Sequence, residues 1–284
     1  MERAAPSAAR RLPRDEALPL RPLTLGELLD TASELVRRRA AALLVTAAVL
    51  ALLEQAVLVP GRLSLDIRLS EGVPDLSGGY WVLLAAGAGL EALIIAWLGA
   101  PAGRAAVAAV TGKPVPRSRW QDRRRQGASI ALVGLVAAVP AALGAFLGPV
   151  WLLGYPLFGL AAVAVTIERR GPFGALKRGA GLAFRGGMRG AAVRIIGYAS
   201  WLLIRFAFFL GLLAGLGYLP LSAEAAEWLL VPLLIAANTL AYASLAALDA
   251  ALLIESRVRQ EGLDLWLTGA ARHREPGPEM LAAR

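Results

Sequence analysis

The longest apolar stretch of the chain, residues 127–167, contains 41 residues and not one Asp, Glu, Lys or Arg. As a single straight helix it would extend about 60 Å, twice the thickness of the hydrocarbon core of a bilayer. We therefore expect two membrane-spanning helices folded back on each other, over residues 128–147 and 150–167. Gly148 and Pro149 mark the expected turn, because Gly and Pro interrupt helices.

Composition and four further apolar runs extend this prediction to the whole chain. Hydrophobic residues make up 57% and charged residues 18% of the 284 residues, against about 45–50% and about 25% in soluble domains. This composition disfavours a soluble globular protein and a disordered one. The further runs predict spans at about 40–60, 80–101, 191–218 and 228–254. We expect an all-α, polytopic bundle of about six spans, forming one transmembrane domain over residues 23–267. Residues 1–22 and 268–284 are expected to be a flexible cytoplasmic arm and tail.

The distribution of Lys and Arg between the loops predicts the orientation. Residues 1–39 carry eight, 112–126 and 168–190 six each, and the region from residue 255 five, whereas 61–79 carries two. Positive residues favour the cytoplasmic side, so both termini are expected in the cytoplasm. Arg makes up 28 of the 30 basic residues, and together with the Ala, Leu and Gly content this suggests a high-GC bacterial genome and hence a bacterial plasma membrane. The net charge of +9 is explained by this asymmetry rather than by nucleic-acid binding.

Amphipathic segments precede three of the predicted spans. Thr24 and Glu27 form an S/T-x-x-E capping box that starts a helix over 25–38. Similar basic segments cover 115–126 and the residues after Pro172. The chain thus suggests three units, each an interfacial helix followed by a transmembrane hairpin. The alternative is that any multi-pass protein with positive cytoplasmic loops contains such segments.

The residue types needed for most catalytic and metal sites are absent. The chain has no Cys and one His, His273, which excludes disulfides, Cys-based metal sites and Cys nucleophiles. It also lacks nucleotide-binding and hydrolase motifs. We therefore expect no catalytic residues, cofactor or metal.

Ionisable residues inside the predicted spans are the main candidates for a functional site. Each costs roughly 2.5–3.5 kcal/mol at a helix centre and therefore tends to face a partner inside the bundle. This candidate intramembrane cluster consists of Glu54, Glu91, Arg205, Asp249, Arg104 and Arg194. Glu91 and Arg205, both near the middle of their spans, are the expected pair. Such residues either form a polar site for an ion, a proton or a lipid headgroup, or they only fix the register of the helices.

Three motifs resemble one known family. They are RPLTLGELLDTASELVRR (21–38), IERRGPFGALKRGAGL (167–182) and ESRVRQEGLDL (255–265). Together they resemble the glycerophosphoryl diester phosphodiesterase membrane domain family of bacterial multi-pass proteins. In that family a separate barrel domain performs catalysis, so the resemblance implies a membrane part without its own activity. The candidate cytoplasmic docking residues lie in the last two motifs: Glu168, Arg178, Arg257, Arg259, Glu261 and Asp264.

Two functions follow as hypotheses. The first is a non-enzymatic integral membrane protein of the bacterial envelope that assembles with or scaffolds other membrane components. Its expected partners are the lipid bilayer, anionic headgroups on the cytoplasmic face and a membrane protein. The second is a transporter or lipid-handling protein that uses the buried charges.

Overall fold

The computed structural model describes residues 18–71, 78–115, 120–146, 151–185, 187–272, 275 and 277–282, and none of these lies in a β-strand. The predicted all-α fold is therefore confirmed. The helices are α1 (Leu25–Arg38), α2 (Ala40–Ser64), η1 (Leu69–Glu71), α3 (Gly78–Thr111), α4 (Trp120–Phe146), α5 (Trp151–Ile167), α6 (Pro172–Phe184), α7 (Arg189–Leu216), α8 (Ala223–Glu261), α9 (Leu263–Ala271) and η3 (Pro278–Leu281).

Five of the six predicted spans are confirmed as helices that are long and apolar enough to cross a membrane. These are α2, α3, α4, α7 and α8, within the part of the chain that the structure describes. The fourth predicted span coincides with α5, which has 17 residues and stands at the short limit for a crossing. The expected turn at residues 148 and 149 lies outside the described residues, between α4 and α5.

The outer surface of the bundle is apolar. On α2, Val45, Val49, Leu52, Leu53 and Val57 are all more than half exposed. A soluble protein rarely exposes so large an apolar patch, whereas contact with lipid tails accounts for it. The charged residues of the spans lie mostly inside, which is the reverse of a soluble helical bundle.

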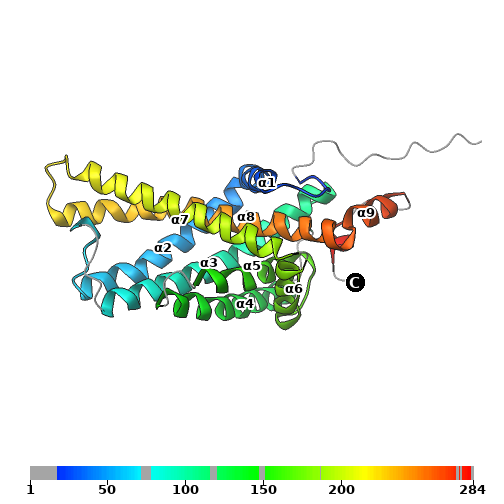
Figure 1. Cartoon of the computed structure of the whole chain (residues 1–284), viewed down its shortest axis with the longest axis horizontal. Coiled ribbons are helices and arrows are strands. Elements are labelled where there is room, and N and C mark those ends of the chain that lie inside the picture. Colours follow the sequence, from blue (N-terminus) through cyan, green and yellow to red (C-terminus); the bar gives the residue numbers. More distant parts are fainter. Residues whose placement is uncertain are drawn as a thin grey trace, which may run out of the picture.

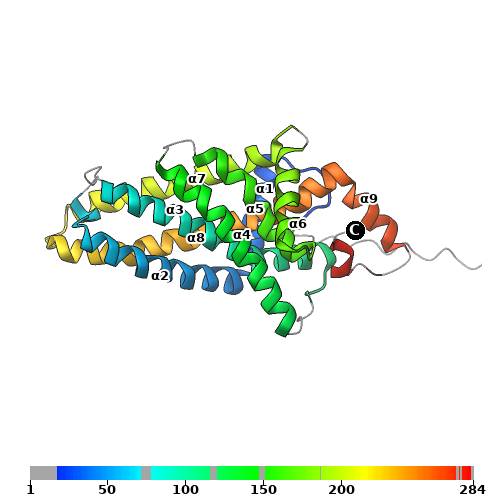
Figure 2. The ribbon, with the colours of Figure 1, turned by 90° about the horizontal axis from the view of Figure 1, so that it is seen from below.

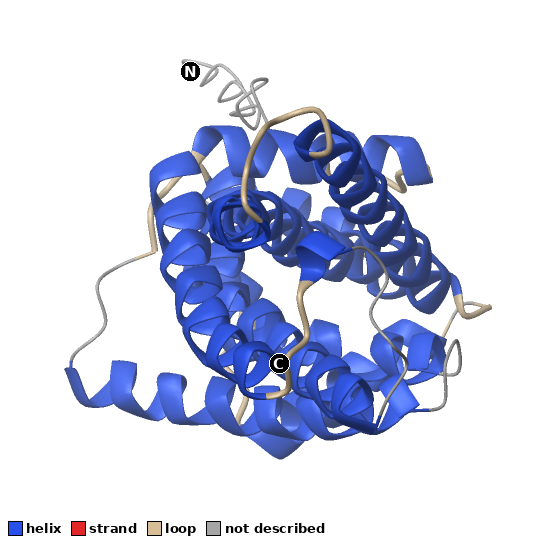
Figure 3. Ribbon diagram, turned by 90° about the vertical axis from the view of Figure 1, so that its left-hand side faces the viewer, coloured by secondary structure: helices blue, strands red, loops and turns tan. Residues whose placement is uncertain are grey.

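The long helices run side by side along the longest axis of the molecule (Figures 1 and 3). The α2–α3 and α7–α8 connections lie at one end, and α1, α6 and α9 lie at the other (Figure 1). The segments richest in Lys and Arg therefore meet at the same end, called here the basic end. That this end faces the cytoplasm stays a prediction.

Helix α8 is the centre of the bundle. It packs against α1, α2, α3 and α7, and residues 241–258 are buried except for the partly exposed Ser244. Alanines at positions 241, 243, 246, 247, 250 and 251 leave room for neighbouring helices to approach closely. A close approach also joins α6 to α5, since a Cβ on Gly179 would lie 2.7 Å from the Ala161 backbone nitrogen.

Two of the three predicted interfacial helices exist as separate helices. In α1, Thr24 and Glu27 form the expected capping box, and α6 begins with Pro172. The prediction of a separate helix over 115–126 is wrong, because residues from Trp120 onward are part of α4. Gly127 is tolerated inside the helix, so no stop signal separates the basic residues from the span. The beginning of α4 stands off the bundle (Figure 2), with Arg123, Arg124 and Arg125 exposed.

Parts of the expected flexible arm and tail pack against the bundle. Leu18 is completely buried and joins the hydrophobic core. Near the other terminus, Met280 and Leu281 of η3 are buried, and Arg257 donates a 2.7 Å hydrogen bond to the Leu281 carbonyl oxygen.

Candidate functional site

Two stripes of polar side chains face each other from α7 and α8. In each helix the three positions are separated by four and then seven residues, which places them on one side of an α-helix. They are Arg194, Tyr198 and Arg205 on α7 and Asn238, Tyr242 and Asp249 on α8. Because the two helices form an antiparallel hairpin, the stripes align: Arg194 meets Asp249, and Arg205 meets Asn238 and the ring of Tyr242.

The middle of the bundle holds the predicted Glu91–Arg205 pair. Arg205 Nη2 lies 2.9 Å from Glu91 Oε1, and the Tyr198 hydroxyl donates a 2.9 Å hydrogen bond to Glu91 Oε2. Glu91 belongs to α3 and Arg205 to α7, so this ion pair joins two helices whose backbones contact each other little. The prediction that these residues meet is confirmed.

Glu54 enters the same region from α2 but does not bind Arg205 directly. The Tyr242 hydroxyl donates to Glu54 Oε1 at 2.7 Å, and Asn238 Nδ2 donates to Glu54 Oε2 at 3.0 Å. Asn238 Oδ1 in turn accepts a 3.4 Å hydrogen bond from Arg205 Nη1. The Arg205 guanidinium carbon also lies 5.8 Å and 5.7 Å from the ring centroids of Tyr198 and Tyr242, within cation–π range.

These six side chains form the mid-bundle cluster, which joins four helices. Its members are Glu54, Glu91, Tyr198, Arg205, Asn238 and Tyr242. All of the hydrogen bonds between them link different helices, apart from a 3.4 Å contact between Arg205 and Tyr198. The cluster can therefore fix the register of the bundle, hold a small ion, or do both.

Nearer the basic end, Arg194 and Asp249 form a second ion pair. Arg194 Nε lies 2.6 Å from Asp249 Oδ1 and Nη2 lies 3.2 Å from Oδ2, with both side chains almost completely buried. Gly159 of α5 packs against the guanidinium, because a Cβ there would lie 1.6 Å from Arg194 Nη2. Arg104 does not join this pair: it is exposed and makes no ion pair among the described residues.

The basic end carries a third network around Glu168, whose side chain is fully buried. Arg178 donates to both carboxylate oxygens of Glu168 at 2.8–2.9 Å and also pairs with Glu261. Arg170 donates to Glu168 at 2.7 Å, and Arg257 Nε lies 3.4 Å from it. Burial alone would lower the pKa of Arg178, but its hydrogen bonds to Glu261 and Glu168 raise that pKa above its usual value.

A neighbouring set of contacts ties α8 to the segment before α1. Arg259 pairs with the buried Glu255 at 2.8 Å and donates to the Leu23 carbonyl oxygen at 3.2 Å. Arg189 donates to the same oxygen at 2.5 Å. Of the predicted docking residues, Asp264 alone joins neither network, and it lies in the first turn of α9, where a carboxylate stabilises the helix dipole.

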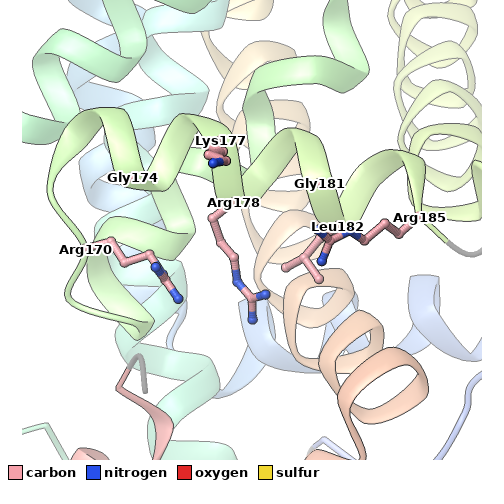
Figure 4. Close-up of a pocket in the computed structure, with 7 residues that line it drawn as sticks. All are labelled: Arg170, Gly174, Lys177, Arg178, Gly181, Leu182 and Arg185. Carbon is pink, nitrogen blue, oxygen red and sulfur yellow. The ribbon is translucent and has the colours of Figure 1, made fainter.

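An open groove of about 290 Å³ runs along α6 beside the Glu168 network (Figure 4). Its lining, called here the α6 groove, consists of Arg170, Gly174, Lys177, Arg178, Gly181, Leu182 and Arg185. Arg170 and Arg178 are paired with Glu168, whereas Lys177 and Arg185 are exposed and make no ion pair among the described residues. The groove therefore carries positive charge that protein carboxylates leave unbalanced.

Several members of these networks are missing from the sequence-based set. Tyr198 and Tyr242 supply the hydroxyl groups of the mid-bundle cluster, and Arg170, Arg189 and Glu255 complete the networks of the basic end. The four-then-seven spacing shared by α7 and α8 is a signal that points to the tyrosines. Arg62 at the end of α2 and Glu227 at the start of α8 lie 3.6 Å apart, at the end of the bundle opposite the basic end. No spacing pattern in the sequence indicates this pair, because η1 brings the two helix ends together.

The fold and its buried ion pairs define a multi-pass membrane protein. Among the described residues, no group of three or more His, Cys, Asp and Glu side chains is placed to hold a metal ion. Comparison with known proteins gave no matching family model, no similar curated protein and no similar solved structure. The resemblance described above therefore stays a prediction.

Proposed function

We propose that this chain is a non-enzymatic scaffold of the bacterial plasma membrane that assembles with other membrane components through its basic end. The observation that carries the proposal is the α6 groove beside a rigid ion-pair network. The network joins the α5–α6 connection, α6 and α8, so the groove is held on a fixed support. Lys177 and Arg185 leave it with unbalanced positive charge, which an anionic component would neutralise.

An anionic phospholipid headgroup is the component that fits this groove best. Phe173 is 76% exposed and Met188 56% exposed beside the basic residues of α6 and its following turn. Basic side chains next to exposed apolar ones are typical of protein surfaces at the lipid–water interface. Each basic residue near an anionic leaflet contributes about 1 kcal/mol. The orientation supported by the loop charges would place this end at the cytoplasmic leaflet.

The absence of an enzymatic role is part of the proposal and rests on the sequence. There is no Cys, and the one His lies in a polar segment near the end of the chain. The resemblance to the membrane domain of a phosphodiesterase family adds support, because the activity of that family belongs to a separate domain.

Native mass spectrometry of protein extracted together with its surrounding lipid tests the proposal. We expect retained anionic phospholipid or a stoichiometric protein partner in the wild type, and loss of the retained component in a Lys177→Glu/Arg185→Glu variant. An Arg123→Glu/Arg125→Glu variant is the matched control, since it makes the same charge change at the exposed start of α4. Release of bare monomers from the wild type, or equal losses from both variants, would contradict a specific groove.

Transport or lipid handling is the second candidate function, and the mid-bundle cluster favours it. If the cluster is a transport site, Glu91→Gln and Arg205→Met should abolish transport while the protein still folds. If its role is structural, each single change should unfold the protein and the double change should restore it.

A further inference from the structure

The mid-bundle cluster contains two carboxyl groups but one guanidinium. Glu54 comes from α2, Glu91 from α3 and Arg205 from α7, while α8 contributes the neutral side chains of Asn238 and Tyr242. With both carboxyl groups ionised, the cluster would carry one uncompensated negative charge in the middle of the apolar spans.

Neighbouring charges do not correct this imbalance. Toward the basic end, Arg194 and Asp249 neutralise each other through two contacts. Toward the other end, Arg62 is balanced by Glu227. Gln55, next to Glu54 on α2, is buried and neutral. Among the described residues, no further cation therefore faces Glu54 from the helices packed around it.

The geometry distinguishes the two carboxyl groups. Glu91 has a guanidinium nitrogen 2.9 Å from Oε1 and a tyrosine hydroxyl on Oε2, which are the partners of an ionised carboxylate. Glu54 is 4% exposed, and its partners at 2.7 Å and 3.0 Å are the neutral Tyr242 and Asn238. A carboxylate so buried and without a cation is strongly disfavoured relative to its neutral acid.

We propose that Glu54 is a proton-binding site at the centre of the bundle, occupied at neutral pH. The bound proton makes the cluster electrically neutral: one ionised Glu91, one Arg205 and one neutral Glu54. A carboxylic acid can donate to the Tyr242 hydroxyl oxygen across the same 2.7 Å contact. A metal cation fits less well, because such ions require several oxygen ligands and Asn238 presents its amide nitrogen to Glu54. This proposal does not rest on the assembly role.

Infrared spectroscopy of the full chain in micelles of an alkyl maltoside, a detergent without carbonyl groups, tests the proposal, because a protonated carboxyl group has a C=O stretch that an ionised carboxylate lacks. At neutral pH we expect this band in the wild type and its loss in Glu54→Gln. The control is Glu224→Gln, at an exposed carboxylate in the first turn of α8, which should keep the band. Glu91→Gln should also lose it, because Glu54 then ionises and takes Arg205 as its partner.

A second measurement keeps the test decisive if Glu54→Gln does not fold. Tyr242→Phe removes one hydrogen-bond partner and should shift the frequency of the band without removing it. Absence of the band from the wild type, or its persistence in Glu54→Gln, would overturn the assignment. A band seen only when sodium is omitted would show that sodium, and not a proton, neutralises the cluster.

Discussion

The Arg194–Asp249 pair allows a quantitative test of what buried charge contributes to this fold. The change Asp249→Asn keeps the size of the side chain but removes the carboxylate 2.6 Å from Arg194 Nε. Both side chains are less than 5% exposed, so water cannot replace the lost charge. Removing one partner of a buried ion pair costs about 3–5 kcal/mol.

Loss of a hydrogen bond between membrane helices lowers the free energy of unfolding by much less. Double-mutant cycles for such bonds average about 0.6 kcal/mol and reach about 1.7 kcal/mol. The free energy of unfolding in mixed micelles, titrated with denaturing detergent, separates the two cases. We expect Asp249→Asn to lower it by about 3 kcal/mol or more, which places the pair in the ion-pair range. A loss below about 1.7 kcal/mol would show that the contact behaves as an ordinary hydrogen bond.

Two further variants test whether charge or packing is responsible. Arg194→Met/Asp249→Leu replaces the pair by apolar side chains and should be neutral or stabilising by about 1–4 kcal/mol. Gly159→Ala should be strongly destabilising in the wild type, because its Cβ would meet the Arg194 guanidinium. In an Arg194→Met background the same change should cost less. If the double variant were as unstable as Asp249→Asn, the account based on uncompensated charge would be wrong.

Three other expected outcomes concern the basic end. Glu168→Gln should lower the free energy of unfolding by about 3 kcal/mol or more, whereas Glu261→Gln, whose carboxylate is 33% exposed, should cost about 1 kcal/mol or less. Gly179→Ala should destabilise by about 1–3 kcal/mol because its Cβ would meet α5 backbone. Gly181→Ala should be neutral or stabilising in the same assay, because its Cβ would meet only Arg185 Nε, at an ordinary contact distance of 4.0 Å. The hydrogen bonds that Glu27 accepts from the Arg21 side chain and the Thr24 backbone lower its pKa from 4.5 to about 2. Its stabilisation of α1 should therefore be complete above pH 4.5 and lost as pH falls toward about 2, which amide exchange in α1 measures. Glu27→Gln should weaken this dependence but not abolish it, because hydrogen bonds from Arg37 and Arg38 lower the pKa of Glu34 in the same helix to about 2.

The spans and the terminal caps could be predicted because their causes are local. The 41-residue apolar run requires a break, and α4 ends and α5 begins on either side of the predicted turn. The capping box of α1 depends on two residues three positions apart. The separate helix expected over 115–126 failed because the same basic residues suit either an interfacial helix or the first turns of a span. Nothing in their composition distinguishes the two.

The partner of a charged residue could be predicted only where the depth of the residues along their spans left a single choice. Glu91 and Arg205 lie near the middle of their spans, so depth alone brought them together. Asp249 had two arginines at similar depth, and helix rotation, which the sequence does not reveal directly, selected Arg194 over Arg104. Arg194 shares a stripe with Tyr198 on α7, whereas Arg104 lies on an exposed side of α3. The spacing of the polar residues within α7 and α8 therefore indicates which arginine pairs with Asp249, whereas depth alone does not.

The distribution of charge along the bundle also distinguishes structural pairs from a candidate site. Where register is the requirement, one cation and one anion suffice, as in Arg194 with Asp249 or Arg62 with Glu227. Such pairs gain nothing from an additional buried carboxyl group, whose ionisation would be costly. Glu54 is such an additional group, and the two side chains that bind it, Tyr242 and Asn238, also belong to the stripe facing Arg205. If the only role of Glu54 were to accept the hydrogen bonds of Tyr242 and Asn238, a neutral amide oxygen could accept them without the cost of a buried ionisable group. The presence of Glu54 is therefore best explained by the ability of a carboxyl group to gain and lose a proton.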